Sequence, residues 1–244
     1  MATTKEVFPS DAILWLEFGG QYVNGAGKTV IDNLATMGNA VKTVQCGDGT
    51  TASTFPTQLV GKRGLSFDGG DYIDTGIVDP FERTDKFSLF VAVSLQSVAT
   101  IGSYLSTSDT AQSNKGIFTY PYSNNKKMYV FLTSQSTTNE IDYYINCNLQ
   151  SFNTFCVTSS GSSLASGIKV YDNAIVGGSS GGTDNLTSTI KNGKPFLLGA
   201  RHNGVSKTTF YTGNIYFAAI FPRELTPLQV SNLHKKVMKR INLP

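Results

Sequence analysis

The chain has 244 residues, of which 15% are charged, and its formal net charge is only +3. This charge is small and spread along the chain, so we expect no nucleic acid as a partner. Every apolar run is far shorter than the roughly 20 residues of a membrane helix, which excludes a helix that crosses a bilayer. Abundant Gly, Ser, Thr and Asn suit many short strands joined by tight turns, so we expect a single all-β domain over residues 1–244.

The first sixty residues predict an arm, one strand and a long irregular region. Residues 1–10 form the N-terminal arm; they contain no apolar segment typical of a secretory signal, so we expect synthesis and folding in the cytoplasm. Residues 11–18 alternate as an early strand, in which Trp15 packs in the core. Glycine turns at short intervals across 19–60 predict loops with one or two short strands.

Residues 64–75 predict a tight hairpin that turns at Gly69-Gly70-Asp71. Its carboxylates could supply the oxygen ligands that Ca²⁺ prefers, which makes calcium candidates of Asp68, Asp71 and Asp74. Their spacing is not that of an EF-hand, and acidic residues beside glycine commonly form turns. We therefore expect no metal and no other cofactor, with calcium as the alternative.

The middle of the chain is a succession of predicted strands. Residues 87–96 show the clearest alternation of period two, which indicates that one face of this strand is buried. Residues 116–132 predict a hairpin with a polar tip, and 141–147 and 154–158 predict two further strands. Residues 168–176 predict another hairpin, which turns at Asp172-Asn173.

The three cysteines, Cys46, Cys147 and Cys156, lack the spacing of metal ligands. Cys147 and Cys156 could face each other across a hairpin, which leaves a disulfide open. The alternative is that all three are buried reduced thiols, as expected for a protein made without export.

The end of the chain predicts a buried strand followed by a helix. Residues 215–221 are almost all apolar or aromatic, which indicates a strand buried on both faces. Pro222 ends this strand, because proline has no N–H for a further pairing. A capping box follows at Thr226, Pro227 and Gln229. We expect a short C-terminal helix and tail over residues 226–244.

Four stretches carry a family resemblance through their order in the chain. They are Gly64-Leu-Ser-Phe-Asp-Gly-Gly-Asp-Tyr-Ile, Phe87-Ser-Leu-Phe-Val-Ala-Val, Ile168-Lys-Val-Tyr-Asp-Asn, and Gly213-Asn-Ile with Arg223-Glu-Leu-Thr. Together they resemble laminin-G-like domains of the concanavalin A-like lectin/glucanase superfamily over residues 11–234. The resemblance implies an all-β, two-sheet antiparallel jelly-roll sandwich. It is a poor guide to function, because this fold hosts lectins, adhesion modules, hydrolases and structural shells.

The resemblance also implies how a hydrolase on this fold would look. Such an enzyme presents two carboxylates on one strand, commonly as Glu-x-Asp-x-(x)-Glu. Glu140-Ile-Asp142 supplies the first half of this pattern, but Tyr144 and Ile145 stand where the second Glu should be. His202 and His234 lie in no recognisable nucleophile motif. We therefore expect that the protein is not an enzyme.

Sugar binding is the remaining chemistry, because aromatic rings and planar polar groups at a sandwich edge can hold sugars. The candidate ligand-binding residues are Tyr120, Tyr122, Arg201, His202, Asn203 and Tyr211. Tyrosine is also common in exposed strands, so a purely structural role stays open for each residue.

These patterns favour a non-enzymatic recognition or surface-display module that binds a glycan or a cell-surface receptor. As a hypothesis, it is a phage virion protein, either a head-decoration or fibre protein or a tail receptor binder, that forms a homo-oligomer and contacts other virion proteins. The alternative is a purely structural capsid-decoration or oligomer-forming protein that binds no glycan. A glycoside hydrolase is the third interpretation.

Overall fold

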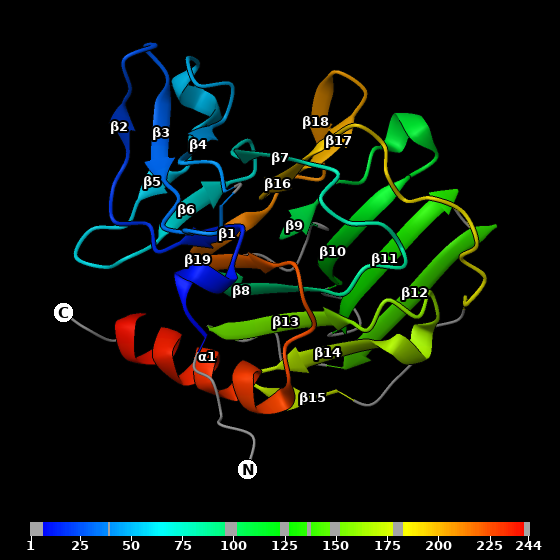
Figure 1. Cartoon of the computed structure of the whole chain (residues 1–244). Helices are drawn as coiled ribbons and strands as arrows, with labels where there is room; N and C mark the ends of the chain where they lie inside the picture. Colours follow the sequence, from blue (N-terminus) through cyan, green and yellow to red (C-terminus); the bar gives the residue numbers. More distant parts are fainter. Residues whose placement is uncertain are drawn as a thin grey trace.

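The computed structural model describes residues 7–38, 40–95, 102–122, 127–135, 138–146, 152–177 and 183–241. Two large antiparallel sheets lie face to face, and the helix α1 (Pro227–Ile241) covers the outer face of one of them (Figure 1). The predicted two-sheet antiparallel sandwich with a short C-terminal helix is therefore confirmed. None of the described helices is long and apolar enough to cross a bilayer.

The sheet under the helix, called the helix-side sheet, contains in spatial order β15 (Ile175–Val176), β14 (Ile168–Asp172), β13 (Asn153–Ser159), β8 (Phe87–Leu95), β19 (Thr212–Phe221), β6 (Leu65–Asp68) and β5 (Thr57–Gln58), with β1 (Leu14–Leu16) also paired to β19. The other, called the open sheet, contains β12 (Asn139–Asn146), β11 (Lys127–Gln135), β10 (Gly116–Tyr122), β9 (Leu105–Ser106), β16 (Pro195–Leu198), β7 (Ile73–Val78), β4 (Thr43–Cys46), β3 (Thr29–Asp32) and β2 (Tyr22–Val23). A separate hairpin joins β17 (Arg201–Asn203) to β18 (Ser206–Thr208), and the short 3-10 helices are η1 (Pro9–Asp11), η2 (Ala52–Thr54), η3 (Thr110–Gln112) and η5 (Ala165–Gly167).

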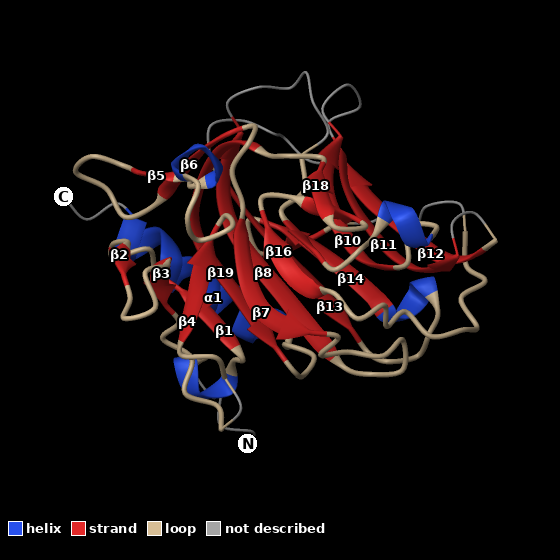
Figure 2. Ribbon diagram, turned by 90° about the horizontal axis from the view of Figure 1, so that it is seen from above, coloured by secondary structure: helices blue, strands red, loops and turns tan. Residues whose placement is uncertain are grey.

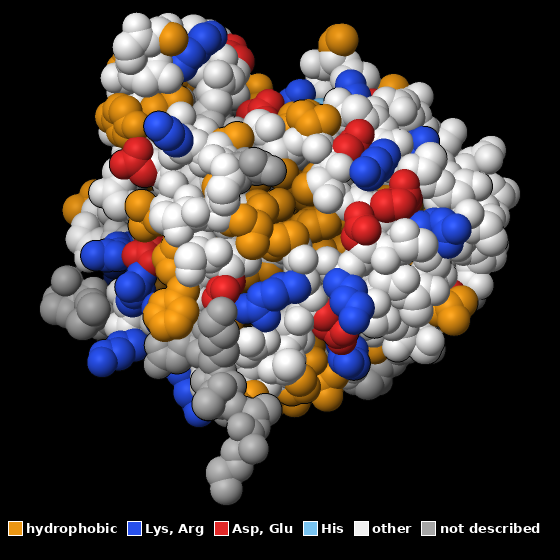
Figure 3. All heavy atoms as spheres, viewed as in Figure 1, with side chains coloured by type: hydrophobic (Ala, Val, Ile, Leu, Met, Phe, Trp, Pro, Cys, Tyr) orange, Lys and Arg blue, Asp and Glu red, His pale blue; other side chains and the backbone are white. Residues whose placement is uncertain are grey.

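Seen from above, strands β10 to β12 occupy one end of the open sheet and β2 and β3 the other (Figure 2). Charged side chains are scattered over the face drawn in Figure 3, while hydrophobic side chains gather in a hollow at its centre. Much of this face is neither charged nor apolar, as expected for a chain with 15% charged residues.

The strand β8 packs on both sides, because successive side chains of a strand point to opposite faces. Phe87, Leu89 and Val91 lie in the core between the two sheets, whereas Phe90 and Ala92 lie in a second core under the helix. The side chains of the neighbouring strand β19 are likewise shared between these two cores. From Ile215 onward all of them are buried except Tyr216. The strand predicted at 215–221, buried on both faces, is confirmed. The strand predicted at 87–96 is present, but both of its faces are buried rather than one.

The helix begins where the capping pattern predicts. The N–H of Gln229 donates to Thr226 Oγ1 at 3.3 Å, and the N–H of Thr226 donates to Gln229 Oε1 at 3.0 Å. This reciprocal pair satisfies N–H groups that have no partner within the first turn. Leu233 and Val237 then bury against the sheet.

Trp15 lies in the core under the helix, as predicted. Its side chain is 1% exposed, and its ring meets Phe217 edge to face with centroids 5.0 Å apart. The indole N–H donates to Glu17 Oε1 at 2.7 Å, so burial leaves this polar group satisfied.

The predicted hairpin at residues 64–75 is wrong. Its two strands belong to different sheets: β6 pairs with β19 and β5, whereas β7 pairs with β16 and β4. Leu65, Phe67 and Ile73 all point into the core between the sheets. The glycine turn thus connects a strand of one sheet to a strand of the other, rather than two paired strands of one sheet.

Two further predictions need correction. Residues 19–60 form four short strands, β2 to β5, rather than one or two. The hairpin of β14 and β15 turns at Asn173-Ala174, both with positive φ, instead of Asp172-Asn173. A two-residue turn with both φ values positive matches the twist of the flanking strands.

Cys46 and Cys156 are buried free thiols. Burial raises the pKa of Cys46 to about 12, so its thiol stays protonated. Cys147 lies outside the described residues, as does most of the polar tip predicted for the 116–132 hairpin. The strands before and after Cys147 are not a hairpin, because β12 pairs with β11 while β13 pairs with β8 and β14.

Candidate functional site

The outward face of the open sheet carries aromatic side chains at its β10 to β12 end, where a solvent-facing strand is normally polar. On β10, Ile117 faces the core, so Phe118, Tyr120 and Tyr122 face outward. The neighbouring strands add Tyr129, Phe131 and Tyr144 to the same face. Pairing brings Tyr120 opposite Tyr129 and Tyr129 opposite Tyr144, with Phe118 opposite Phe131.

A cavity of about 220 Å³ opens at one end of this aromatic face. Its apolar walls are Phe118, Tyr120 and Phe131, and its polar lining is Ser108, Asn114, Thr133, Glu140 and Arg201. Pockets for drug-sized ligands measure about 300–1,000 Å³, so this cavity suits a smaller group. Rings beside hydroxyls, an amide and both signs of charge can hold a ligand that has apolar faces and many polar substituents.

Arg201 lies over one wall of the cavity. Its guanidinium carbon is 4.4 Å from the ring centre of Phe118, and Nη2 donates to Ser108 Oγ at 3.0 Å and to Asn114 Oδ1. Burial lowers the pKa of Arg201 to about 10, which still leaves the side chain charged at neutral pH. Within the described residues Nε has no hydrogen-bond partner, and no carboxylate forms an ion pair with this guanidinium.

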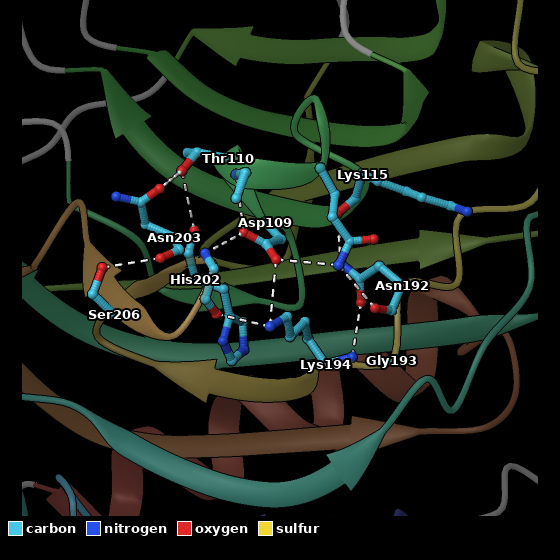
Figure 4. Close-up of polar contacts among 12 residues, drawn as sticks. Asp109, Thr110, Lys115, Asn192, Gly193, Lys194, His202, Asn203 and Ser206 are labelled. Atoms are coloured by element: carbon cyan, nitrogen blue, oxygen red, sulfur yellow. Dashed lines mark hydrogen bonds and ion pairs between the residues drawn. The ribbon is translucent and has the colours of Figure 1, made fainter.

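The buried carboxylate of Asp109 has polar contacts with residues from several separate segments (Figure 4). Asp109 is 1% exposed and accepts hydrogen bonds from the N–H groups of Ala111 at 3.0 Å and Gly204 at 2.8 Å, with Lys194 Nζ at 3.5 Å. Burial acts to raise the pKa of Asp109, but these partners outweigh it and the pKa is lowered. The ionised carboxylate therefore holds η3 against the β17–β18 hairpin.

A glycine sets the direction in which the chain leaves β16 toward Arg201. Gly199 has φ +85°, a conformation that favours glycine. A Cβ atom at this position would lie 2.5 Å from a ring carbon of Phe67, which is fully buried. The close approach of backbone and ring thus requires a residue without a side chain.

We expect Gly199→Ala to lower the free energy of unfolding by about 2–4 kcal/mol, through backbone strain and overlap with Phe67. Urea denaturation measures the change. Gly193→Ala is the matched control, because Gly193 has φ +76° but open space around its Cβ position. Equal losses in the two variants would contradict the overlap with Phe67.

The structure brings together only part of the predicted site. Tyr120 and Arg201 line the cavity. Tyr122 lies on the same face beyond the cavity, with its ring centroid 5.8 Å from that of Tyr129. Asn203 is exposed and accepts a hydrogen bond from Thr110 Oγ1 at 2.7 Å, beside the buried Asp109 (Figure 4).

The other two candidates are interior residues and cannot contact a ligand in this structure. His202 is 2% exposed, and its Nε2 donates to the carbonyl oxygen of Pro195 at 2.8 Å. Tyr211 is completely buried, and its hydroxyl donates to the carbonyl oxygen of Ser94 at 2.9 Å. Both side chains stabilise the fold that carries Arg201.

The carboxylates of the three calcium candidates accept hydrogen bonds from backbone N–H groups within turns. Asp71 accepts from the N–H of Asp68 at 2.8 Å, Asp68 from that of Gly70 at 2.8 Å, and Asp74 from that of Gly76 at 2.9 Å. Burial raises the pKa of Asp71 to about 6. Across the described part of the chain, no three acidic, His or Cys side chains converge to hold a metal ion.

Sequence reasoning missed most of the cavity and of the aromatic face. In the sequence, Glu140 stands out only as half of a catalytic pair, and Phe118, Tyr129 and Phe131 only as members of predicted strands. A signal was present, because aromatic residues recur at every second position in 118–122 and 129–131. Rings at that spacing share one face of a strand.

The sequence matches the family model described as the concanavalin A-like lectin/glucanases superfamily over residues 67–231. No curated protein matches the chain.

Several solved structures share its fold. A Trypanosoma rangeli sialidase in complex with 2,3-difluoro-KDN has a TM-score of 0.59 at 12% identity, covering 92% of this chain and 32% of that chain. A mutant of the same sialidase that displays trans-sialidase activity has a TM-score of 0.64 at 14% identity, covering 98% and 35%. The CBM40 of the Ruminococcus gnavus IT-sialidase, bound to α2,3 sialyllactose, has a TM-score of 0.55 at 12% identity, covering 71% and 97%. This chain thus spans about a third of the length of the sialidase chains.

Proposed function

Because the chain belongs to the concanavalin A-like lectin/glucanases superfamily, we propose that it is a carbohydrate-recognition module whose cavity beside Arg201 binds one sugar residue of a glycan. The observation that carries the proposal is the Arg201 guanidinium, which lies above Phe118 in an aromatic-walled cavity and forms no ion pair among the described residues. A sugar ring has apolar C–H faces that pack on such rings. Its hydroxyls can bond with the side-chain amide of Asn114, which lines the cavity.

An acidic sugar fits the charges of this cavity best. Arg201 would pair its free donors with a carboxylate, the geometry for which a guanidinium is suited. Glu140 comes from β12, two strands away from Phe118, and would accept hydrogen bonds from hydroxyl or amide groups at the other end of the same sugar. The sialyllactose bound to the Ruminococcus gnavus CBM40 makes sialylated glycans the first ligands to test.

The proposal includes binding without turnover. Glycosidases commonly place two carboxyl groups on either side of the scissile bond. Among the described residues that line the cavity, Glu140 supplies the one carboxylate. Release of reducing sugar that disappears in Glu140→Gln would overturn this part of the proposal and restore the glycosidase interpretation.

We expect the purified protein to bind sialylated glycans on a glycan array, and Tyr120→Ala to weaken the affinity for α2,3-sialyllactose by about tenfold in isothermal titration calorimetry. The variant removes one aromatic wall of the cavity. Tyr22→Ala is the matched control, since Tyr22 is 44% exposed on β2 at the opposite edge of the open sheet. The absence of glycan binding in the wild type would reject the proposal and favour the purely structural role.

Display in many copies would complete this function, because a single small sugar site adheres usefully only when it is repeated. We therefore propose that the module works in a homo-oligomer, as on the surface of a phage virion, where it would be a head-decoration or fibre protein or a tail receptor binder. Sedimentation equilibrium tests whether the protein is a homo-oligomer.

The neighbouring genes test the role in a virion. Capsid or tail genes beside its own gene would support that role, and genes of a cellular pathway in their place would contradict it.

A further inference from the structure

We propose that the outward rings of β10 to β12 form a second subsite, which binds the neutral sugars that follow the terminal sugar in an oligosaccharide. This inference rests on the proposed function of the cavity. We call the second subsite the aromatic shelf and define it as Tyr122, Tyr129 and Tyr144. All three side chains are half-buried on the outward face of the open sheet.

The aromatic shelf continues directly from the cavity. Tyr120 and Phe131 line the cavity, and both stack on Tyr129, with ring centroids 5.3 Å and 5.9 Å away. Tyr144 follows on the next strand, 5.2 Å from Tyr129. Because strands lie about 4.8 Å apart, the rings from β10 to β12 extend for about 10 Å across the sheet. A ligand that leaves the cavity in this direction passes over aromatic rings.

The rings hold one another in place. Tyr120 and Tyr129 lie within 9° of parallel, and Tyr129 and Phe131 within 12°. Tyr122 stands at 82° to Tyr129 and closes one side of the stack. A surface fixed in this way loses little side-chain entropy when a ligand binds. The aromatic shelf is therefore suited to weak contacts with successive sugar rings.

The aromatic shelf and the cavity suit sugars of different charge. Lys127 Nζ lies 3.8 Å from the ring centre of Tyr144. Asp142 faces outward between Glu140 and Tyr144 and lies opposite Phe131, so this carboxylate is at the cavity end of β12. The rings of the aromatic shelf carry no charge and offer stacking to neutral sugars. Arg201 lines the cavity and forms no ion pair among the described residues, so its donors suit an acidic terminal sugar there.

The test compares two ligands by isothermal titration calorimetry: α2,3-sialyllactose and the methyl glycoside of its terminal sialic acid. We expect the wild type to bind the trisaccharide about tenfold more tightly, through stacking on the aromatic shelf. Tyr144→Ala should remove most of this difference while the methyl glycoside binds as before, because Tyr144 does not line the cavity. Tyr129→Ala is a second variant, and Tyr129→Phe, which retains the ring, should keep most of the difference.

Tyr22→Ala again serves as the control, and thermal unfolding of each variant shows whether it folds. Equal affinity of the wild type for the two ligands would overturn the aromatic shelf and leave the cavity proposal standing. Equal weakening of both ligands by Tyr144→Ala would do the same. Binding of neither ligand, together with an array that shows no other glycan, would overturn both proposals. If the array shows binding of glycans with a different terminal sugar, the test compares an oligosaccharide that ends in that sugar with the methyl glycoside of that sugar, and the same outcomes decide.

Discussion

Replacement of Trp15 by alanine is expected to lower the free energy of unfolding by about 3–5 kcal/mol, the cost of deleting a large buried aromatic side chain. Trp15 fills the space between the helix-side sheet and α1, where it meets Phe217 at 5.0 Å and Phe221 at 6.3 Å, both edge to face. Lys236 of the helix also lies 5.2 Å from its ring. The variant thus leaves a cavity where the helix docks.

Urea denaturation followed by circular dichroism measures this loss. Trp15→Phe should cost less, because it keeps an aromatic ring in this space, although it loses the hydrogen bond to Glu17. Tyr22→Ala deletes an exposed aromatic side chain from the edge strand β2 and should change the stability by less than about 1 kcal/mol. A Trp15→Ala variant as stable as Tyr22→Ala would show that the core under the helix does not stabilise the fold.

Arg201→Ala is expected to weaken binding of α2,3-sialyllactose by about 100-fold, since hydrogen bonds of a charged donor contribute about 1.5–3 kcal/mol each. The variant removes the positive charge of the cavity and the group stacked on Phe118. Arg201→Lys should recover only part of the affinity, because an ammonium group keeps the charge but not the planar pair of donors.

Calorimetry at two salt concentrations separates charge from packing. The affinity of the wild type should fall as the salt concentration rises, because the ions screen the attraction between Arg201 and a carboxylate, and the affinity of Arg201→Ala should change little. Arg63→Ala is the control, since Arg63 is an exposed arginine paired with Glu17 and does not line the cavity. A neutral glycan that binds as tightly as a sialylated one would contradict the role of the guanidinium as a carboxylate partner.

The elements that sequence reasoning predicted correctly are those whose signal is local. The alternation in β8 follows from the geometry of a single strand, and the apolar run of β19 from its burial on both faces. Thr226 and Gln229 satisfy N–H groups only three residues apart, so four consecutive residues are enough to predict where α1 begins. The core position of Trp15 follows from its place in such a strand.

The errors came where pairing partners lie far apart in the chain. Leu65, Phe67 and Ile73 show the same pattern whether their strands pair in one sheet or face each other across the core. Periodicity indicates which side chains are buried, but not against which sheet they pack. His202 and Tyr211 were misplaced for the same reason, because a polar aromatic residue looks alike in sequence whether its hydrogen-bond partner is a ligand or a buried carbonyl group.

By itself, the sequence determined the strand-rich class and the closing strand and helix, because these follow from periodicity, capping and turn chemistry within short segments, and its resemblance to laminin-G-like domains implied the sandwich. Only the tertiary structure decided where a ligand could bind. Phe118 and Glu140 reach the cavity through the register of β10, β11 and β12, while Arg201 arrives from a segment more than 60 residues later, held by the buried Asp109. Contacts between such distant segments depend on how whole sheets pair, and no local pattern encodes that pairing.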